Sequence, residues 1–239
     1  MTRTNWGPHR TGSRRDDAAS SGVKTREHDA VDGTADAFER GLDLDRVAFF
    51  SDAVFAIAMT VLVVSLRLPA DTTNAGVAAA LRKELPSVYA YFLSFAVIGL
   101  YWVAHHRHFR LICRIDSTML LLNLAALSLV AFLPFPTQVL GENTGSRAAV
   151  IFYAATVALL GALITGSWAY DCYHHRLIRP DTPDALVRHS LWRGVIVVAV
   201  FTLSIPVAFV HPHAAELFWL LIVPGRFVLH RAYGSIAGS

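Results

Sequence analysis

The chain is 239 residues long, and 54% of it is hydrophobic while only 16% is charged. A soluble domain carries roughly a quarter charged residues, so this composition excludes an ordinary soluble protein and indicates one that needs lipid. The net charge of +3 could suggest a nucleic-acid partner, but the basic residues lie mainly in the N-terminal tail and in short loops beside apolar runs. That placement is typical of membrane orientation, and we expect no nucleic acid as a partner.

The N-terminal segment, residues 1–42, is rich in Arg, Asp, Ser, Thr, Gly and Ala and has few large apolar residues. It cannot bury enough surface to offset chain entropy, so we predict a disordered cytosolic tail. Arg14 and Arg15 suggest a twin-arginine export signal. However, Asp16 and Asp17 follow, and no apolar region appears for about thirty residues, so we expect no export signal.

Six apolar runs follow the tail, and each is near the roughly 20 residues that span a hydrocarbon core. We therefore predict an all-α integral membrane protein, with a six-helix transmembrane domain at 43–231 and a short cytosolic tail at 232–239. The sixth run is the weakest, because it is short and carries Glu216 and Arg226. The runs are Phe49–Leu68, Val88–His105, Thr118–Phe135, Ala148–Tyr170, Leu191–Val210 and Ala214–Leu229.

The basic residues of the short loops predict which side of the membrane each loop occupies. The loops after the second and fourth runs and the C-terminal segment hold most of these arginines, whereas the opposite loops hold few. Because basic loops favour the cytosol, both termini are predicted to be cytosolic, which requires an even number of spans. Cys113 and Cys172 fall in the cytosolic loops, so we expect free thiols.

The first run begins with the polar pattern Arg46-x-x-x-Phe50-Ser51-Asp52. An ionised carboxylate at membrane depth costs a few kcal/mol or more unless it faces a polar interior or a partner, so Asp52 needs an explanation. One interpretation is an acid in the headgroup region that the helix dipole stabilises. The other is a side chain that ties the first helix to its neighbours.

An apolar stripe follows this pattern along the same helix. At about 100° per residue, Ile57, Val61, Val64 and Leu68 lie on one narrow face. Asp52 points well away from that face. We therefore expect Asp52 to contact neighbouring helices and not to line the space that the stripe faces.

The second run ends with His105, His106 and His108. Imidazole is a common metal ligand, so one alternative is a membrane enzyme or metal-binding protein that uses these histidines. Adjacent histidines on a helix point about 100° apart, and no Cys or carboxylate is grouped with them at ligand spacing. We favour a basic cytosolic helix end, with His105 meeting Asp52 or Ser51 across a helix interface.

Asn123 lies within the third run, where a polar side chain needs a partner on another helix. It either serves packing alone or joins the interactions around Asp52. Pro134 and Pro136 are expected to end the third run, and Pro206 to kink the fifth.

The sequence contains no motif typical of a nucleotide-binding protein, a metalloenzyme or an ordinary potassium channel. We find no phosphate-binding glycine loop, no catalytic metal motif and no Thr-Val-Gly-Tyr-Gly potassium filter. The middle of each run also lacks the ionisable residues that a secondary transporter usually places there. We therefore expect no enzyme and no cofactor, and favour passive permeation or a structural role, with a secondary transporter as a further alternative.

The pattern from Arg46 to Asp52 resembles the start of the first helix in the transmembrane protein 175 family of potassium channels, and the run Phe-Ser-Asp-Ala-Val-Phe-Ala-Ile-Ala-Met-Thr is very similar to that of the family. The tryptophan and paired histidines of the second run, and the asparagine and Pro-Phe-Pro of the third, extend the resemblance. It implies a prokaryotic plasma-membrane homotetramer whose first helices line a potassium-permeable pore, with potassium ions and membrane lipid as partners.

The resemblance also implies roles for individual residues. The isoleucine at the narrowest point of the pore falls on Ile57, and the pore-facing positions one and two turns on fall on Val61 and Val64. Thr60 and Leu68 flank them. The family has leucines at the two valine positions, so this chain's smaller side chains imply a wider pore or a differently placed gate. The residues expected to hold the first helix in place are Arg46, Phe50, Ser51, Asp52, His105 and Asn123.

Overall fold

A computed structural model describes residues 43–67, 74–173 and 176–222, and it is helical apart from loops and one isolated β-bridge. Within these residues, five helical segments are long and apolar enough to cross a membrane. The prediction of an all-helical, multi-pass membrane protein is therefore confirmed at this level. The five segments are Asp43–Ser65, Leu85–Phe109, Ser117–Glu142, Arg147–Cys172 and Asp184–Val210.

Several predictions fall wholly or partly outside the described residues. These include both terminal tails and Leu68. The predicted sixth span is described only as far as Ile222, where it forms the short helix α8 (Pro212–Phe218) and the 3₁₀ turn η3 (Trp219–Leu221). A sixth crossing of the membrane therefore stays a prediction.

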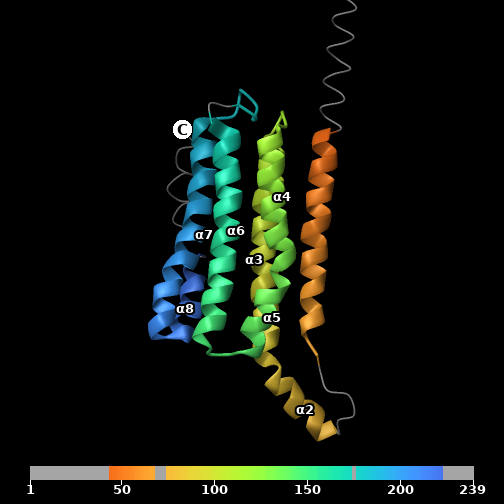
Figure 1. Cartoon of the computed structure of the whole chain (residues 1–239), viewed down its shortest axis with the longest axis vertical. Coiled ribbons are helices and arrows are strands. Elements are labelled where there is room, and N and C mark those ends of the chain that lie inside the picture. Colours follow the sequence, from red (N-terminus) through yellow and green to blue (C-terminus); the bar gives the residue numbers. More distant parts are fainter. Residues whose placement is uncertain (1–42, 68–73, 174–175, 223–239) are drawn as a thin grey trace, which may run out of the picture. The chain divides into compact units, whose positions relative to one another are not determined.

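The helix α6 (Arg147–Cys172) occupies the centre of the fold. It packs against α7 (Asp184–Val210) on one side and against α4 (Ser117–Phe132) on another (Figure 1). Its sequence from Ala148 to Ala169 contains no charged residue. A helix that is apolar all round is expected in this central position, because helices pack against it on more than one side.

The third span continues beyond the point where the sequence predicted its end. Helix α4 stops at Phe132, but α5 (Pro134–Glu142) follows directly, and the N–H of Thr137 donates to the carbonyl of Leu133 at 3.1 Å. Pro134 and Pro136 therefore mark the end of α4, as predicted, but they do not end the span, which continues through α5 to Glu142. Proline is tolerated in the first turn of a helix, because the N–H that it lacks has no intrahelical partner there.

Close helix contacts depend on two glycines. A Cβ on Gly141 in α5 would lie 2.8 Å from the Cα of Ser87 in α3 (Leu85–Phe109), and one on Gly194 in α7 would overlap the side chain of Thr165 in α6. Small residues let helices in membranes approach to backbone contact. The sequence therefore brings α3 against α5, and α6 against α7, at these positions.

The loops that follow α3 and α6 pack against each other at one end of the protein. The N–H of Cys113 donates to the carbonyl of Leu177 at 2.8 Å, and that of Arg179 donates to Leu111 at 3.0 Å. A small apolar cluster lies beneath them and is separate from the main core. It consists of Ile112, Met119, Trp168, Leu177 and Ile178. The two arginine-rich loops thus share one end of the fold, and both Cys113 and Cys172 are free cysteines there.

Asp116 joins this end to the start of α4. Its Oδ1 accepts a hydrogen bond from the N–H of Met119 at 2.8 Å, and its Oδ2 accepts one from the Tyr170 hydroxyl at 2.7 Å. Arg176 lies 3.4 Å from the same Oδ2. The hydrogen bond from the Met119 N–H lowers the pKa of Asp116. The hydrogen bond from the Tyr170 hydroxyl and the positive charge of Arg176 lower it further.

Replacing Asp116 with alanine is expected to lower stability by about 1–2 kcal/mol at neutral pH, because it removes a helix N-cap. The folded pKa is depressed, so this stabilisation is complete above the unfolded pKa of about 3.9 and is lost as the pH falls through the folded value. Melting temperatures of both proteins from pH 7 to pH 3 should therefore converge in acid. Asp181→Ala, in an exposed loop position, serves as the control. A gap between native and Asp116→Ala that is independent of pH would contradict this account.

Candidate functional site

The first span, Asp43–Ser65, has one face packed against the rest of the protein. Ser51, Phe55, Ala58 and Leu62 are almost completely buried. Their spacing of four, three and four residues places them on one side of a helix. The last turn of the span is the 3₁₀ helix η1 (Leu62–Ser65), so the helix tightens from Leu62, the last residue of this buried face.

The predicted pore stripe lies outside this buried face. Ile57 is 61% exposed, Val61 43% and Val64 57%. Residues three apart eclipse one another in a 3₁₀ turn, so Val64 lies above Val61 along the helix. The single chain therefore leaves a continuous apolar row uncovered on its first span.

Three further predicted residues are also exposed. Phe50 lies on the uncovered side, and Thr60 lies beside the stripe. The hydroxyl of Thr60 donates to the carbonyl of Ile57 at 2.8 Å, so its hydrogen is already engaged within the helix. Its oxygen still has accepting capacity. Arg46, at the beginning of the motif, is exposed too.

Asp52 contacts the second span. Its Oδ1 accepts a hydrogen bond from the indole Nε1–H of Trp102 in α3 at 2.8 Å. An acid at this depth needs such a partner, and the indole N–H is a donor that must itself find an acceptor when buried. This contact fits the second of the two interpretations of Asp52, in which the acid ties the first helix to a neighbour.

A second, buried connection joins three helices. The Nε2 of His105 in α3 lies 2.9 Å from Oδ1 of Asn123 in α4, and Nδ2 of Asn123 donates to Oγ of Ser51 at 3.1 Å. Because the amide oxygen only accepts, the first contact assigns a proton to Nε2 of His105. The Ser51 hydroxyl in turn donates to the carbonyl of Val47 at 2.8 Å. All three side chains are buried.

These contacts change the pairing expected from the sequence. His105 was predicted to meet Asp52 or Ser51 directly, but Asn123 lies between His105 and Ser51, and Trp102 bonds to Asp52. Trp102 was not predicted from the sequence as the partner of Asp52. The sequence feature that could have identified this partner is the spacing of three residues between Trp102 and His105. It places both side chains on the same side of α3.

The three histidines at the end of α3 have separate surroundings. The ring of His105 stacks on Phe109, with centroids 4.4 Å apart, and that of His106 stacks on Trp102 at 5.6 Å. His108 stacks on Trp168 of α6 at 4.2 Å. Among the described residues, no three His, Cys, Asp or Glu side chains are grouped so that they could hold a metal ion. The three histidine rings therefore pack against different aromatic partners.

Comparison with known proteins identifies close relatives. The family model described as the endosomal/lysosomal potassium channel TMEM175 matches residues 46–134. A protein named as a potassium channel in Streptomyces collinus is 32% identical over 169 residues, which cover 69% of this chain and 82% of the relative. A mouse protein named as an endosomal/lysosomal proton channel is 37% identical over 105 residues, covering 41% of this chain but only 21% of the mouse protein.

A solved structure resembles the fold as well. It is the crystal structure of a lysosomal potassium-selective channel TMEM175 homologue from Chamaesiphon minutus, with a TM-score of 0.67 and 26% sequence identity. The match covers 78% of this chain and 98% of that one. The matched family region begins at Arg46, so it includes the motif, the Asp52–Trp102 contact, the buried connection through Asn123 and the exposed stripe.

Proposed function

The chain belongs to the TMEM175 family of channels, and from this we propose that it forms a potassium-permeable cation channel whose first span lines the pore. The observation that carries the proposal is the row of Ile57, Val61 and Val64, which the single chain leaves exposed on a helix whose other face is buried. A pore between subunits accounts for an uncovered apolar row on a helix that carries the family motif.

The proposed assembly is a homotetramer of six-helix subunits in the prokaryotic plasma membrane, with both termini in the cytosol. Four copies of Ile57 form the main constriction, and the two valine levels follow it along the pore. Rings of apolar side chains exclude water when the pore is narrow and pass partly hydrated ions when it dilates. Small changes in diameter then gate conduction without a carbonyl filter.

The hydrogen bonds of Ser51 and Asp52 to neighbouring helices set the rotation of the first span in this proposal. Ile57 lies six residues after Ser51, which places it about 120° around the helix from the buried face. A helix held at Ser51 by Asn123 and at Asp52 by Trp102 cannot turn freely about its axis. The polar residues therefore determine which apolar side chains face the pore, although they do not line it.

Replacing Asp52 with alanine is expected to weaken tetramer assembly, because it leaves the indole N–H of Trp102 without its acceptor. The contact is half-buried, so its loss costs about 1 kcal/mol. Size-exclusion chromatography with light scattering measures the loss of tetramer. Asp45→Ala removes an exposed acid from the same helix and should assemble like the native chain. Intact, fully active tetramers of Asp52→Ala would count against this role.

The sequence left other functions open besides a channel: a membrane enzyme or metal-binding protein, and a secondary transporter. The chain, as a member of a channel family, is not an enzyme. The metal-binding alternative needs the histidines after Trp102 to converge, and their separate stacking partners do not favour this. A secondary transporter would show saturable flux that depends on a proton gradient.

Ion flux through purified protein in liposomes tests the proposed function. Potassium gradients should drive a flux that exceeds sodium flux under matched conditions and does not saturate at low concentration. A proton-selective flux, as the name of the mouse relative suggests for that protein, would assign a different ion. No ion flux from confirmed tetramers would contradict the proposal, and stoichiometric metal required for activity would favour the histidine alternative.

A further inference from the structure

A small cavity of about 20 Å³ lies between α3, α4 and α6, beside the buried connection that holds the first span. His105 and Asn123, which belong to that connection, form part of its wall, and Trp168 and Asp171 of α6 form another part. A buried water molecule needs roughly 10–15 Å³ of such space and two to four polar partners. The cavity therefore has room for one molecule or ion of the size of water and excludes larger ligands.

Two polar atoms of this wall are buried without a hydrogen bond. Within the described residues, the structure gives no partner to the indole Nε1–H of Trp168 or to Oδ1 of Asp171. Their side chains are only 1% and 3% exposed. A buried polar group without a partner carries the full cost of its desolvation, and such groups in folded proteins are usually satisfied by protein or by ordered water. Both atoms therefore call for a ligand in the cavity that they share.

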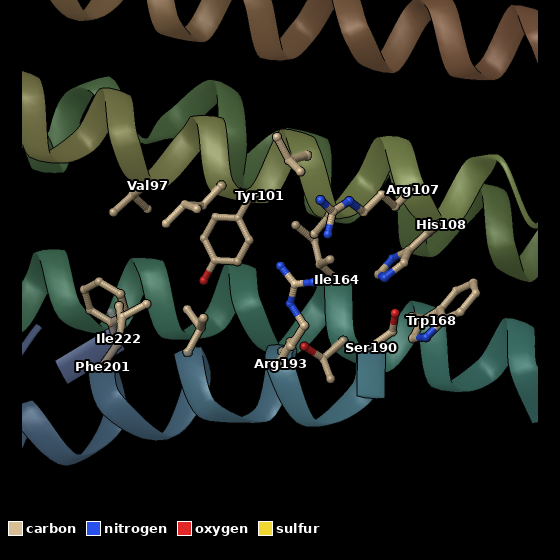
Figure 2. A pocket seen from close by; sticks show the side chains of 16 residues that line it. Val97, Tyr101, Arg107, His108, Ile164, Trp168, Ser190, Arg193, Phe201 and Ile222 are labelled. Carbon is tan, nitrogen blue, oxygen red and sulfur yellow. The ribbon is translucent and has the colours of Figure 1, made fainter. Parts of the chain in front are cut away.

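Contacts from neighbouring elements hold these two residues at the cavity. The ring of Trp168 stacks on that of His108 from α3, with an angle of 7° between the rings and centroids 4.2 Å apart (Figure 2). The backbone carbonyl of Asp171 accepts a hydrogen bond from the N–H of Leu177 at 3.2 Å. Since the two residues are three apart on α6, they lie on the same side of that helix.

The two unsatisfied atoms identify the chemical class of the ligand. The indole N–H of Trp168 only donates, whereas the carboxylate oxygen of Asp171 only accepts. A potassium ion, which is similar in size to water, would pair with the carboxylate but would be repelled by the positive end of the N–H. An anion would satisfy the indole and be repelled by the carboxylate. Water accepts from the first group and donates to the second.

We propose that this cavity is a binding site for one ordered water molecule, which accepts a hydrogen bond from Nε1–H of Trp168 and donates one to Oδ1 of Asp171. Its second hydrogen has an acceptor in the same wall, because His105 carries its proton on Nε2 and its Nδ1 therefore accepts. Three hydrogen bonds are typical of a buried water. The water thereby joins α6 to the connection through Asn123, which links the first span, α3 and α4.

High-resolution structures of the full-length protein, one in potassium and one in rubidium, test the site directly. A density peak is expected within about 2.7–3.2 Å of both Nε1 of Trp168 and Oδ1 of Asp171, with no anomalous signal from rubidium at that position. A cavity without such a peak would overturn the proposal. An anomalous rubidium peak would overturn it too, because it would assign a site for a monovalent cation.

Oxidation of Trp168 by hydroxyl radicals provides a second test, since X-ray radiolysis of a bound water releases radicals beside a buried side chain. Asp171→Leu removes the acceptor and Ala126→Val narrows the cavity from α4, so both should lower the labelling of Trp168 several-fold. Asp171→Asn keeps an acceptor oxygen and should label like the native chain. Native labelling of Trp168 in both Asp171→Leu and Ala126→Val would overturn the proposal.

Trp219 is the internal control for this labelling. It is 3% exposed, and its Nε1–H already donates to Oγ of Ser204 at 2.9 Å. Its labelling should stay low in the native chain and in each variant, which also shows that the variants are folded. Neither the density nor the labelling measures ion flux, so both results hold whether or not the first span lines a pore.

Discussion

Replacing Ile57 with asparagine is expected to raise potassium leak through the proposed channel by about tenfold or more and to reduce its preference for potassium over sodium. Four amides in place of four apolar side chains would hold water at the constriction. A tenfold rise corresponds to a barrier lower by only about 1.4 kcal/mol. Potassium and sodium flux in liposomes, normalised to the amount of tetramer, measures both effects.

Val63→Asn is the matched control for this experiment. Val63 is an exposed aliphatic residue in the same helix, but it points about 120° away from Val61 and Val64 in the 3₁₀ turn. Its replacement introduces the same amide away from the proposed pore. Potassium flux that is unchanged in Ile57→Asn, or equally raised in both variants, would contradict the assignment of Ile57 to the pore.

Replacing Asn123 with leucine is expected to lower the free energy of unfolding by about 2–4 kcal/mol. The change removes two interhelical hydrogen bonds and leaves the imidazole of His105 and the hydroxyl of Ser51 without this partner. Each unsatisfied buried group costs about 1–3 kcal/mol, although interhelical hydrogen bonds in membranes average less. Thermal unfolding in detergent measures the loss, and flux measurements should show poorer selectivity because the first span is less firmly held.

Ser128→Ala provides the control on the same helix. Ser128 is exposed, and its hydroxyl donates only to the carbonyl of Ala125 within α4. Its removal should change stability by less than about 0.5 kcal/mol. If Asn123→Leu is as stable and as selective as Ser128→Ala, the buried connection does not position the first span.

The sequence could predict the spans because their signal is local. Long apolar runs identified five described segments, and helix periodicity separated the exposed stripe of Ile57 from the face that contains Ser51. The ends of the spans were harder to predict from the sequence. Pro134 is a helix breaker in an interior turn but is tolerated in a first turn, and the sequence does not say which of the two it occupies.

The partners of the buried polar residues could be predicted only in part. Polarity within apolar runs identified Asp52, His105 and Asn123 as residues that need partners. Their pairing depends on the rotation and height of separate helices, which no spacing along one helix determines.

Cysteine accessibility during current recording tests directly whether potassium passes along the first span. The background chain carries Cys113→Ser and Cys172→Ser, so that it has no native thiol. Silver ion, a thiol-reactive cation that enters where potassium does, is then applied to Ile57→Cys and Val63→Cys in planar bilayers. Rapid, irreversible block of the potassium current in Ile57→Cys, with the Val63→Cys current preserved, is the predicted result. A potassium current that persists in Ile57→Cys would contradict the account.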